Sequence, residues 1–433
     1  MIRLYDFDEV KPEEILNRDI RAEADVEATV DAIIADVRAR GDAALLDYAA
    51  KFDHAQLDSV QVTQAEIDEA FAELEASDPE FITTLKMAAA NIRHFHEQQL
   101  HKNFVLNDRP GMVLGQKYTP IQRAGVYVPG GTAAYPSTVL MDVIPAKVAG
   151  VQQIVMTTPA GRDGKVNAGI LAAAVIAGID CIFKTGGAQA VAALAYGTES
   201  VPAVDKIVGP GNIYVATAKR KVFGKVGIDM IAGPSEILVL ADGTCNPAWV
   251  AADLLSQAEH DKLATPVLVT DSWDLAKAVQ AELEVQIPQL PRAAIARASV
   301  DSNGKIIVTD DMKKAIDAVN IIAPEHLEIC VDDPFAVLND IQNAGSIFLG
   351  KNVPEALGDY FAGPNHTLPT SGTARFSSPL GVDDFVKKSS FIYYTREALG
   401  EVQARIANFA EHEGLHAHAK SVTIRFEDEQ KRE

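Results

Sequence analysis

The sequence predicts an α/β protein with largely parallel sheets. From residue 121 onward, short apolar runs rich in β-branched residues alternate with Ala-rich helical stretches, and the junctions between them are rich in Gly and Pro. The helical stretches have the length that a right-handed crossover between parallel strands needs. With 433 residues, at roughly 150 residues per domain, the chain is long enough for two to four domains.

Up to about residue 105 the pattern is helical. The first clear helix has one apolar face and is expected to end at Gly41. The residues expected on its buried face are Val26, Val30, Ile33, Ile34 and Val37. The parallel strands expected later in the chain are the runs at 125–128, 153–156, 181–184, 205–208 and 237–240.

A second stretch of helices and strands, residues 247 to 350, ends in a buried strand signal at 345–350. A long segment without clear periodicity then runs to about residue 381, and loops of that length are usually functional or disordered. The last fifty residues look helical, from Thr395 to about Glu413 and again around 415–424.

The composition restricts the partners and the compartment. Sixty acidic residues against 39 basic ones give a net charge of −21, which would repel phosphate backbones and anionic membranes, so we expect no nucleic-acid partner. The three cysteines, Cys181, Cys245 and Cys330, form no CxxC pair, as in a reducing compartment. The N-terminus is acidic, and the longest apolar run, 168–179, is too short to span a membrane. We therefore expect a cytoplasmic protein without a membrane association.

Glycine-rich junctions follow three of the expected strands, at 129–132, 186–189 and 209–212. In an open parallel sheet, ligands bind beyond the carboxyl ends of the strands, and free N–H groups at helix starts bind anions. These junctions therefore favour a phosphate-bearing cofactor, although each one by itself could be only a tight turn. The GxGxxG fingerprint of a standard dinucleotide-binding fold is absent from the sequence.

Metal-ligating residue types gather in the second half of the chain. An Asn-Pro pair predicts the start of a helix on which Gln257 and His260 lie three residues apart on one face. With Asp359 and either His416 or His418, they would supply amide, imidazole and carboxylate donors, a set that suits zinc. The alternative is a helix face that packs at a domain boundary.

Glu325 and His326 place a carboxylate and an imidazole side by side just before an apolar run. An imidazole can accept and return protons near neutral pH, and a glutamate can polarise water. Cys330 raises the alternative of a thiol nucleophile. If the run is a strand, however, His326 and Cys330 stand about 13 Å apart at roughly 3.3 Å per residue, too far for a hydrogen-bonded pair. A buried structural cysteine is the better interpretation.

Eight motifs, in order along nearly the whole chain, resemble those of the histidinol dehydrogenases. They are AGVYVPGG at 124–131, TGGAQAVAALAYGT at 185–198, VGPGNIYVATAKR at 208–220, IDMIAGPSE at 228–236, LLSQAEHD at 254–261, APEHLE at 323–328, PNHTLPT at 364–370 and EGLHAHA at 413–419. The resemblance implies a zinc-containing, NAD⁺-dependent homodimer that oxidises L-histidinol through L-histidinal to L-histidine, with two NAD⁺ consumed per turnover.

The resemblance also implies a role for each site residue. His326 would be the general base, and Glu325 would activate the water that hydrates the aldehyde. The residues implied to hold one zinc ion per subunit are Gln257, His260, Asp359 and His418. The residues implied to contact substrate are Ser235, Gln257, His260, His326, Asp359, Glu413 and His418, and those near NAD⁺ are Tyr127, Gln189 and Asn212. His416 and His366 stand as possible additional contributors.

The family architecture implies two incomplete Rossmann-like domains, the second inserted into the first, with small helical terminal segments that exchange between subunits. Glu413 and His418 would then come from the partner. The implied boundaries are 1–21 for an N-terminal arm, 22–120 with 237–381 for the first domain, 121–236 for the NAD⁺-side domain and 382–433 for the C-terminal segment.

Three other functions share part of this pattern. A dehydrogenase of the same fold could act on another alcohol, because a fold does not fix a substrate. A zinc hydrolase could use the same ligands to activate water, but it would have no use for the glycine-rich junctions. A non-catalytic nucleotide-binding protein would need neither zinc nor His326.

Overall fold

The computed structural model describes residues 1–10, 24–130 and 134–427. The chain forms two compact units. The first consists of Met1–Leu100 and Ile121–Phe385, and the second of His101–Pro120 and Val386–Glu433. The expected α/β class with mostly parallel sheets is confirmed, since two of the three sheets are entirely parallel. Residues 11–21 of the expected N-terminal arm, and Gly131 and Thr132, lie outside the described residues.

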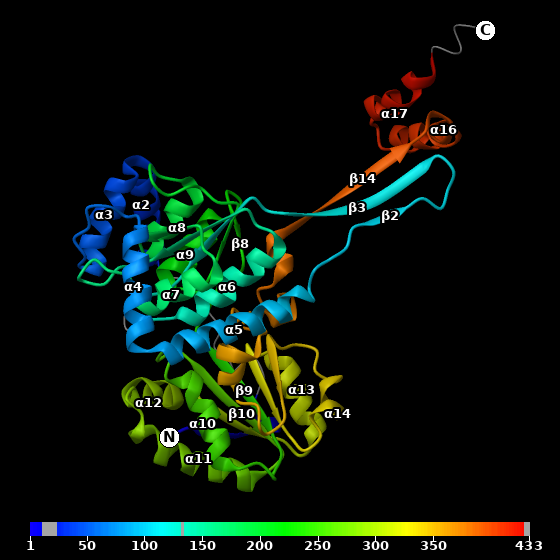
Figure 1. Cartoon of the computed structure of the whole chain (residues 1–433). Coiled ribbons are helices and arrows are strands. Elements are labelled where there is room, and N and C mark those ends of the chain that lie inside the picture. Colours follow the sequence, from blue (N-terminus) through cyan, green and yellow to red (C-terminus); the bar gives the residue numbers. More distant parts are fainter. Residues whose placement is uncertain (11–23, 131–133, 428–433) are drawn as a thin grey trace. The chain divides into compact units, whose positions relative to one another are not determined.

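A five-stranded parallel sheet lies in the first unit, with the order β6-β5-β4-β7-β8 (Figure 1). Four of its strands coincide with runs expected from the sequence. The strands are β4 (Arg123–Tyr127), β5 (Gln153–Thr158), β6 (Cys181–Lys184), β7 (Lys206–Val208) and β8 (Gly227–Ile228). The helices that connect them are α6 (Pro136–Ala149), α7 (Ala168–Ala177), α8 (Gly187–Tyr196) and α9 (Ile213–Val222).

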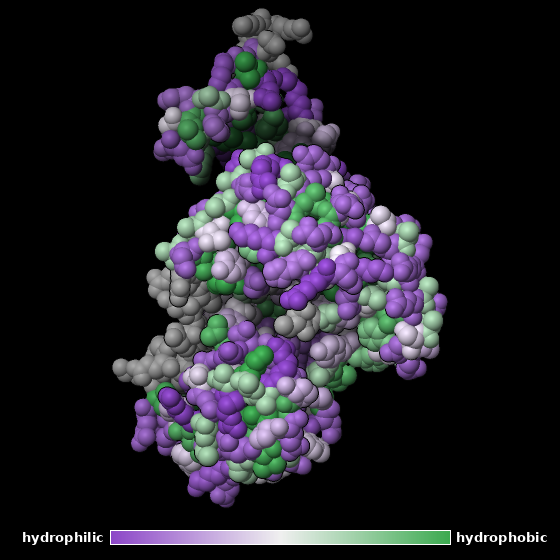
Figure 2. Space-filling model, turned by 90° about the vertical axis from the view of Figure 1, so that its left-hand side faces the viewer, coloured by the Kyte–Doolittle hydropathy of each residue, from purple (hydrophilic) through white to green (hydrophobic). Residues whose placement is uncertain are grey.

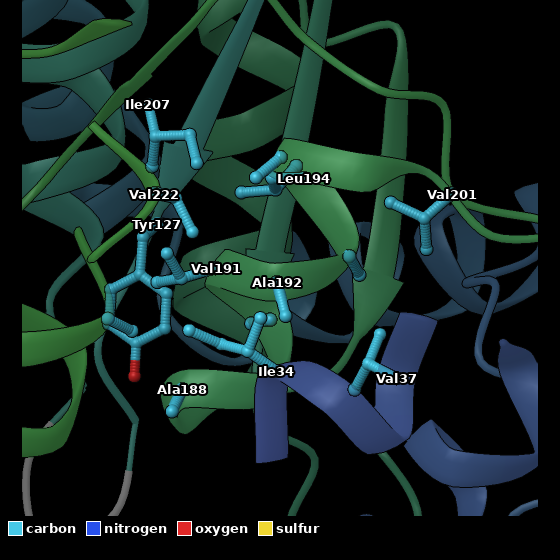
Figure 3. Packing of buried hydrophobic residues seen from close by; sticks show 14 of the residues in the cluster. Ile34, Val37, Tyr127, Ala188, Val191, Ala192, Leu194, Val201, Ile207 and Val222 are labelled. Carbon is cyan, nitrogen blue, oxygen red and sulfur yellow. The ribbon is translucent and has the colours of Figure 1, made fainter. Parts of the chain in front are cut away.

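Helix α2 (Ala24–Arg40) covers α8 and α9, and its apolar face forms part of the core beside this sheet. Figure 3 shows Ile34 and Val37 of α2 beside Ala188, Val191 and Ala192 of α8. Four of the five expected residues are buried, and Val26 is packed against the cluster but only partly buried. The helix ends before Gly41, whose φ of 55° lies in the left-handed region that favours glycine.

The second parallel sheet has six strands in the order β1-β11-β10-β9-β12-β13. Its strands are β1 (Arg3–Asp6), β9 (Glu236–Ala241), β10 (Thr265–Thr270), β11 (Lys305–Val308), β12 (His326–Cys330) and β13 (Ser346–Leu349). The helices packed on it are α10 (Pro247–Ala258), α11 (Trp273–Gln286), α12 (Ala293–Ser302), α13 (Met312–Ile322) and α14 (Pro334–Leu338). Residues 3–6 of the expected arm thus form an edge strand of this sheet, paired with β11.

Both faces of the six-stranded sheet are covered. Ile237 and Val239 pack in the core formed with α10, α11 and α12, whereas Leu238 and Leu240 pack in the core formed with α13. All six residues of β9 are buried. Strands buried on both faces read as continuous apolar runs, and this is the pattern that predicted the strand at 237–240.

The remaining elements of the first unit are shorter or lie outside the sheets. They are α3 (Asp42–Tyr48), η2 (Ala49–Asp53), α4 (Gln64–Ser77), α5 (Pro79–Glu97), η1 (Phe7–Glu9), η3 (Ile287–Gln289), α15 (Glu355–Leu357), η4 (Gly358–Ala362), η5 (Thr373–Arg375) and η6 (Val382–Phe385). The segment expected to lack periodicity up to residue 381 contains only such short turns of helix.

The second unit contains a three-stranded antiparallel sheet in the order β14-β3-β2. Its elements are β2 (Phe104–Leu106), β3 (Met112–Pro120), β14 (Val386–Tyr394), α16 (Arg396–His412), α17 (His416–Thr423) and η7 (Ile424–Phe426). Helices α16 and α17 lie where the sequence predicted them. Residues 386–394, which we expected within a helical segment, instead pair with β3 as a strand.

The face of the molecule drawn in Figure 2 is mainly hydrophilic, with small hydrophobic areas between the polar residues. Within the described ranges, no helix has both the length and the apolar character that a bilayer crossing requires.

Candidate active site

Glu325 and His326 lie where β12 begins, and the backbone of Glu236 on the neighbouring strand β9 holds both side chains. The Glu236 N–H donates to Glu325 Oε2 at 2.8 Å, and His326 Nδ1 lies 2.9 Å from the Glu236 carbonyl oxygen. A carbonyl only accepts, so Nδ1 carries the proton of this bond. The parallel pairing of β9 and β12 sets His326 opposite Ile237. The adjacent pair therefore has a fixed orientation.

The free nitrogen of His326 points toward Asp359. Nε2 is buried, lies 3.6 Å from Asp359 Oδ1 and has no hydrogen-bond partner in the described part of the chain. Burial lowers the pKa of His326, but the charges of Glu325 and Asp359 outweigh it and raise this pKa well above its ordinary value. Burial likewise acts to raise the pKa of Asp359, but the neighbouring His326 and Glu355 side chains outweigh it and hold this pKa below its usual range.

Glu355 is a residue of this site that the sequence reasoning missed. One ligand atom each from His326, Glu355 and Asp359 lies within 4.8 Å of the others. Burial, with a hydrogen bond to Asp359, raises the pKa of Glu355 to about 8. The signal available in the sequence is the spacing of Glu355 and Asp359, four residues apart as on one helical face. It is visible only once the segment is known to be helical.

Gln257 and His260 lie at the end of α10. The helix ends at Ala258, and the His260 N–H donates to the Gln257 carbonyl at 3.1 Å in a tighter final turn. In such a turn the side chains of residues three apart lie one above the other. Burial lowers the pKa of His260, while the nearby charges of Asp359 and Glu325 oppose this shift. Thus the structure brings His260 near the Asp359 carboxylate.

These residues fit a metal ion of borderline character. Gln257 is buried, and its Nε2 has no partner among residues 1–10, 24–130 and 134–427. A buried amide with an unsatisfied polar atom is costly unless something completes the site. Nε2 is a donor and cannot ligate a metal, but a half-turn of the amide puts the acceptor Oε1 at this position, where a metal ion would satisfy it. Amide, imidazole and carboxylate donors together are compatible with zinc.

Tyr127, Gln189 and Asn212 lie at the carboxyl edge of the five-stranded sheet. Tyr127 ends β4, and its hydroxyl accepts the Gly187 N–H at 3.1 Å where α8 begins. Burial raises the pKa of Tyr127 to about 12. Figure 3 shows the Tyr127 ring beside Val191 and Ile34. Gln189 is buried on α8, and Asn212 caps α9 by accepting the N–H groups of Tyr214 and Val215.

Three residues expected to act on the substrate, Ser235, Glu325 and His326, lie at the amino edge of the six-stranded sheet. Glu325 and His326 stand at the amino ends of parallel strands, whereas ligands in open sheets usually bind at carboxyl ends. Ser235 directly precedes β9, and its carbonyl accepts the Thr265 N–H at 2.9 Å. The two edges are joined by a contact between Thr138 Oγ1 on α6 and His366 Nε2 at 3.3 Å.

Glu413 and His418 belong to the second unit. Glu413 caps α16 and His418 lies on α17, and both side chains are exposed, as is His416. Their part in the site stays a prediction.

Cys330 is buried at the end of β12. Burial, with the charges of Glu328 and Asp253, raises the pKa of its thiol far above the ordinary value. A thiol that stays protonated is a poor nucleophile, which agrees with a structural role.

Known proteins resemble this chain over almost its whole length. A family model described as histidinol dehydrogenase matches residues 16–426. A histidinol dehydrogenase of Listeria monocytogenes is 53% identical over 97% of both chains, and one of Bacillus subtilis is 58% identical over 85% of this chain and 86% of its own. The crystal structure of histidinol dehydrogenase from Elizabethkingia anophelis superposes with a TM-score of 0.93 at 38% identity over 99% of both chains.

Proposed function

The chain belongs to the histidinol dehydrogenase family of NAD-dependent oxidoreductases in histidine biosynthesis, and from this premise we propose a zinc-dependent, four-electron oxidation of L-histidinol through L-histidinal to L-histidine with two NAD⁺. The observation that supports it most is the Glu325–His326 pair, fixed on the Glu236 backbone beside Asp359. A base and a water-activating carboxylate side by side are what two consecutive oxidations at one carbon require.

Gln257, His260, Asp359 and His418 would hold the zinc ion, one per subunit. The buried, unsatisfied amide of Gln257 and the proximity of His260 to Asp359 support this ligand set. When bound, zinc would supply a positive charge that offsets the Asp359 carboxylate and would orient the substrate through its imidazole and amine.

His326 acts as the general base in both oxidations. Its Nδ1–H is held by the Glu236 carbonyl, so Nε2 is the atom that accepts the proton. In the first step the hydroxyl proton goes to Nε2 while the hydride on the same carbon goes to NAD⁺, which leaves the aldehyde and NADH. The neutral form of His326 is the active one, which a positive charge near Asp359 favours.

Glu325 serves the second step. It accepts a proton from a water molecule whose oxygen adds to the aldehyde carbon. The resulting hydrate anion then loses a hydride to a second NAD⁺, and its remaining hydroxyl proton goes to His326, which has released the proton of the first step. The products are the carboxylate of L-histidine and a second NADH. Because Glu325 Oε2 is bound to the Glu236 N–H, the position of this carboxylate is fixed before substrate binds.

NAD⁺ would bind at the carboxyl edge of the five-stranded sheet, near Tyr127, Gln189 and Asn212. Helix α8 starts there, and the positive end of a helix dipole suits the pyrophosphate in a protein of net charge −21.

We infer a homodimer in which Glu413 and His418 of the partner subunit complete each site. In support of this, the second unit buries few apolar residues, and Ile392 and Phe409 are 74% and 69% exposed. Exposed apolar residues of this kind mark association surfaces. We also propose that the enzyme works in the cytoplasm, where NAD⁺ and reduced thiols are available.

The division of roles is tested by assaying each oxidation separately, with L-histidinol and with L-histidinal. His326→Asn should slow both steps by about 10²- to 10⁴-fold, whereas Glu325→Gln should slow histidinal oxidation far more than histidinol oxidation. Glu75→Gln, an exposed change on α4, serves as the control and should leave both rates unchanged. Equal losses in both steps for Glu325→Gln would refute the assignment.

A further inference from the structure

Helix α6 contains Pro145 in its interior, and this proline leaves one backbone carbonyl without its helical partner. In an α-helix the carbonyl of residue 141 accepts the N–H of residue 145, which proline lacks. The free Met141 carbonyl instead accepts Asn365 Nδ2 at 2.6 Å, in a buried bond between positions far apart in the sequence. The proline therefore creates a binding position for one asparagine.

The turn around Asn365 is fixed to α6 by a second bond. Asn365 Oδ1 accepts the Thr367 N–H at 2.8 Å, and Thr367 Oγ1 donates to Asp142 Oδ1 at 2.8 Å. All three side chains are buried. Because Met141 and Asp142 are consecutive on α6, the turn is held at two adjacent points and cannot rotate about either one.

His366 lies between these two fixed residues. Its Nδ1 is 3.1 Å from the Asp359 carbonyl, which can only accept, so Nδ1 carries the proton. Nε2 then accepts from the Thr138 hydroxyl at 3.3 Å. Both ring nitrogens are thus engaged, and the ring connects the backbone of Asp359 to the first turn of α6.

Helix α6 also faces the turn that follows β7. A Cβ atom placed on Gly209 would lie 3.1 Å from Oδ2 of Asp142 on α6. One helix therefore contacts both the turn next to Asp359 and the turn that begins at Gly209 and leads into Asn212.

We propose that Asn365 is a positioning residue for the reaction: by seating the 365–367 turn on the carbonyl that Pro145 leaves free, it fixes the Asp359 backbone, and hence the zinc, relative to the NAD⁺-side turn. This inference rests on the proposed function. It assigns to Asn365 and Pro145 a role in geometry, with no contact to substrate or cofactor.

The test compares Asn365→Ala with Asn320→Ala. Asn320 is a matched control because its Nδ2 donates to the Asp340 carbonyl at 2.8 Å and its Oδ1 accepts the Gln342 N–H at 2.7 Å, away from the site. Zinc affinity, measured by competition with a chromogenic chelator, should fall about tenfold in Asn365→Ala and kcat by about 10- to 100-fold, whereas the control should match the wild type in both. Wild-type zinc affinity and kcat in a folded Asn365→Ala protein would overturn the proposal.

Pro145→Ala provides a second, independent variant. It gives residue 145 an N–H that competes for the Met141 carbonyl, and it places a better helix former inside α6. We expect thermal stability at or above that of the wild type, together with weaker zinc binding and a lower kcat. If Pro145 had a purely structural role, zinc affinity and kcat would not fall in a variant whose thermal stability is maintained. Unchanged zinc affinity and kcat would therefore overturn the proposal even if Asn365→Ala does not fold. A wild type that neither binds zinc nor forms NADH would overturn the proposed function and this inference together.

Discussion

The carboxyl group of Asp142 should make the protein less stable as the pH rises, and Asp142→Asn should remove this effect. Asp142 is completely buried on α6, and the only hydrogen bond to its carboxyl group among the described residues comes from Thr367. Burial raises its pKa from an ordinary value of 3.8 to about 8. The folded protein therefore keeps the proton over a pH range in which the unfolded chain has lost it.

The size of the effect follows from the difference between the two pKa values. Between pH 3.8 and about 8 the folded state binds one more proton at Asp142 than the unfolded state. The free energy of unfolding then falls by about 1.4 kcal/mol per pH unit, or about 2.7 kcal/mol from pH 5 to pH 7. Asparagine is neutral at every pH and its Oδ1 can still accept from Thr367, so this slope is absent from the variant.

The assay is thermal unfolding of wild type and Asp142→Asn at pH 5, 6 and 7. The melting temperature of the variant should rise relative to that of the wild type at each step of pH, whatever their difference at pH 5. Asp317→Asn, an exposed change on α13, should follow the wild type throughout. A constant difference between Asp142→Asn and the wild type across the three pH values would show that Asp142 is not held protonated.

Three further changes test other parts of the account. Gly209→Ala should cost about 2 kcal/mol or more of stability, because φ is 110° and the new Cβ would overlap the Tyr127 carbonyl oxygen; a melting temperature equal to that of the wild type would contradict this. Cys330→Ala should keep kcat within about twofold, because the buried thiol takes no part in the reaction, and it should cost about 1 kcal/mol of stability as a small core change. Loss of NADH formation in a folded variant would restore the thiol hypothesis. Glu355→Gln should keep the zinc affinity near that of the wild type, whereas Glu355→Ala should weaken it about tenfold. Equal zinc affinities of the two variants, measured by chelator competition, would contradict this.

The parallel strands can be predicted from the sequence because strands buried on both faces are continuous apolar runs. The runs at 153–156 and 237–240 lie within β5 and β9. Strand β14 carries no such signal, because the seven residues between its ends are all exposed. Its first half is polar, and its one apolar run, 391–394, directly adjoins the helical pattern that begins after Tyr394, which dominates the interpretation.

The site can be predicted only in part. Glu325 and His326 are adjacent in the sequence, so their chemistry is visible without a fold. That the Glu236 backbone orients both depends on β9 lying beside β12, and sheet order is not encoded in any local pattern. Glu355 joins the site only through the turn of helix that brings it to Asp359. The bond from Asn365 to Met141 likewise appears only in three dimensions.

The most direct test of the account is the amount of NADH formed per molecule of L-histidinol consumed, before and after removal of metal with a chelator. The account predicts two NADH per molecule, loss of activity on chelation and recovery on addition of zinc. One NADH per molecule would contradict the four-electron oxidation and indicate a simple alcohol dehydrogenase of the same fold. No NADH would contradict the proposed reaction altogether and direct attention to hydrolysis or nucleotide binding.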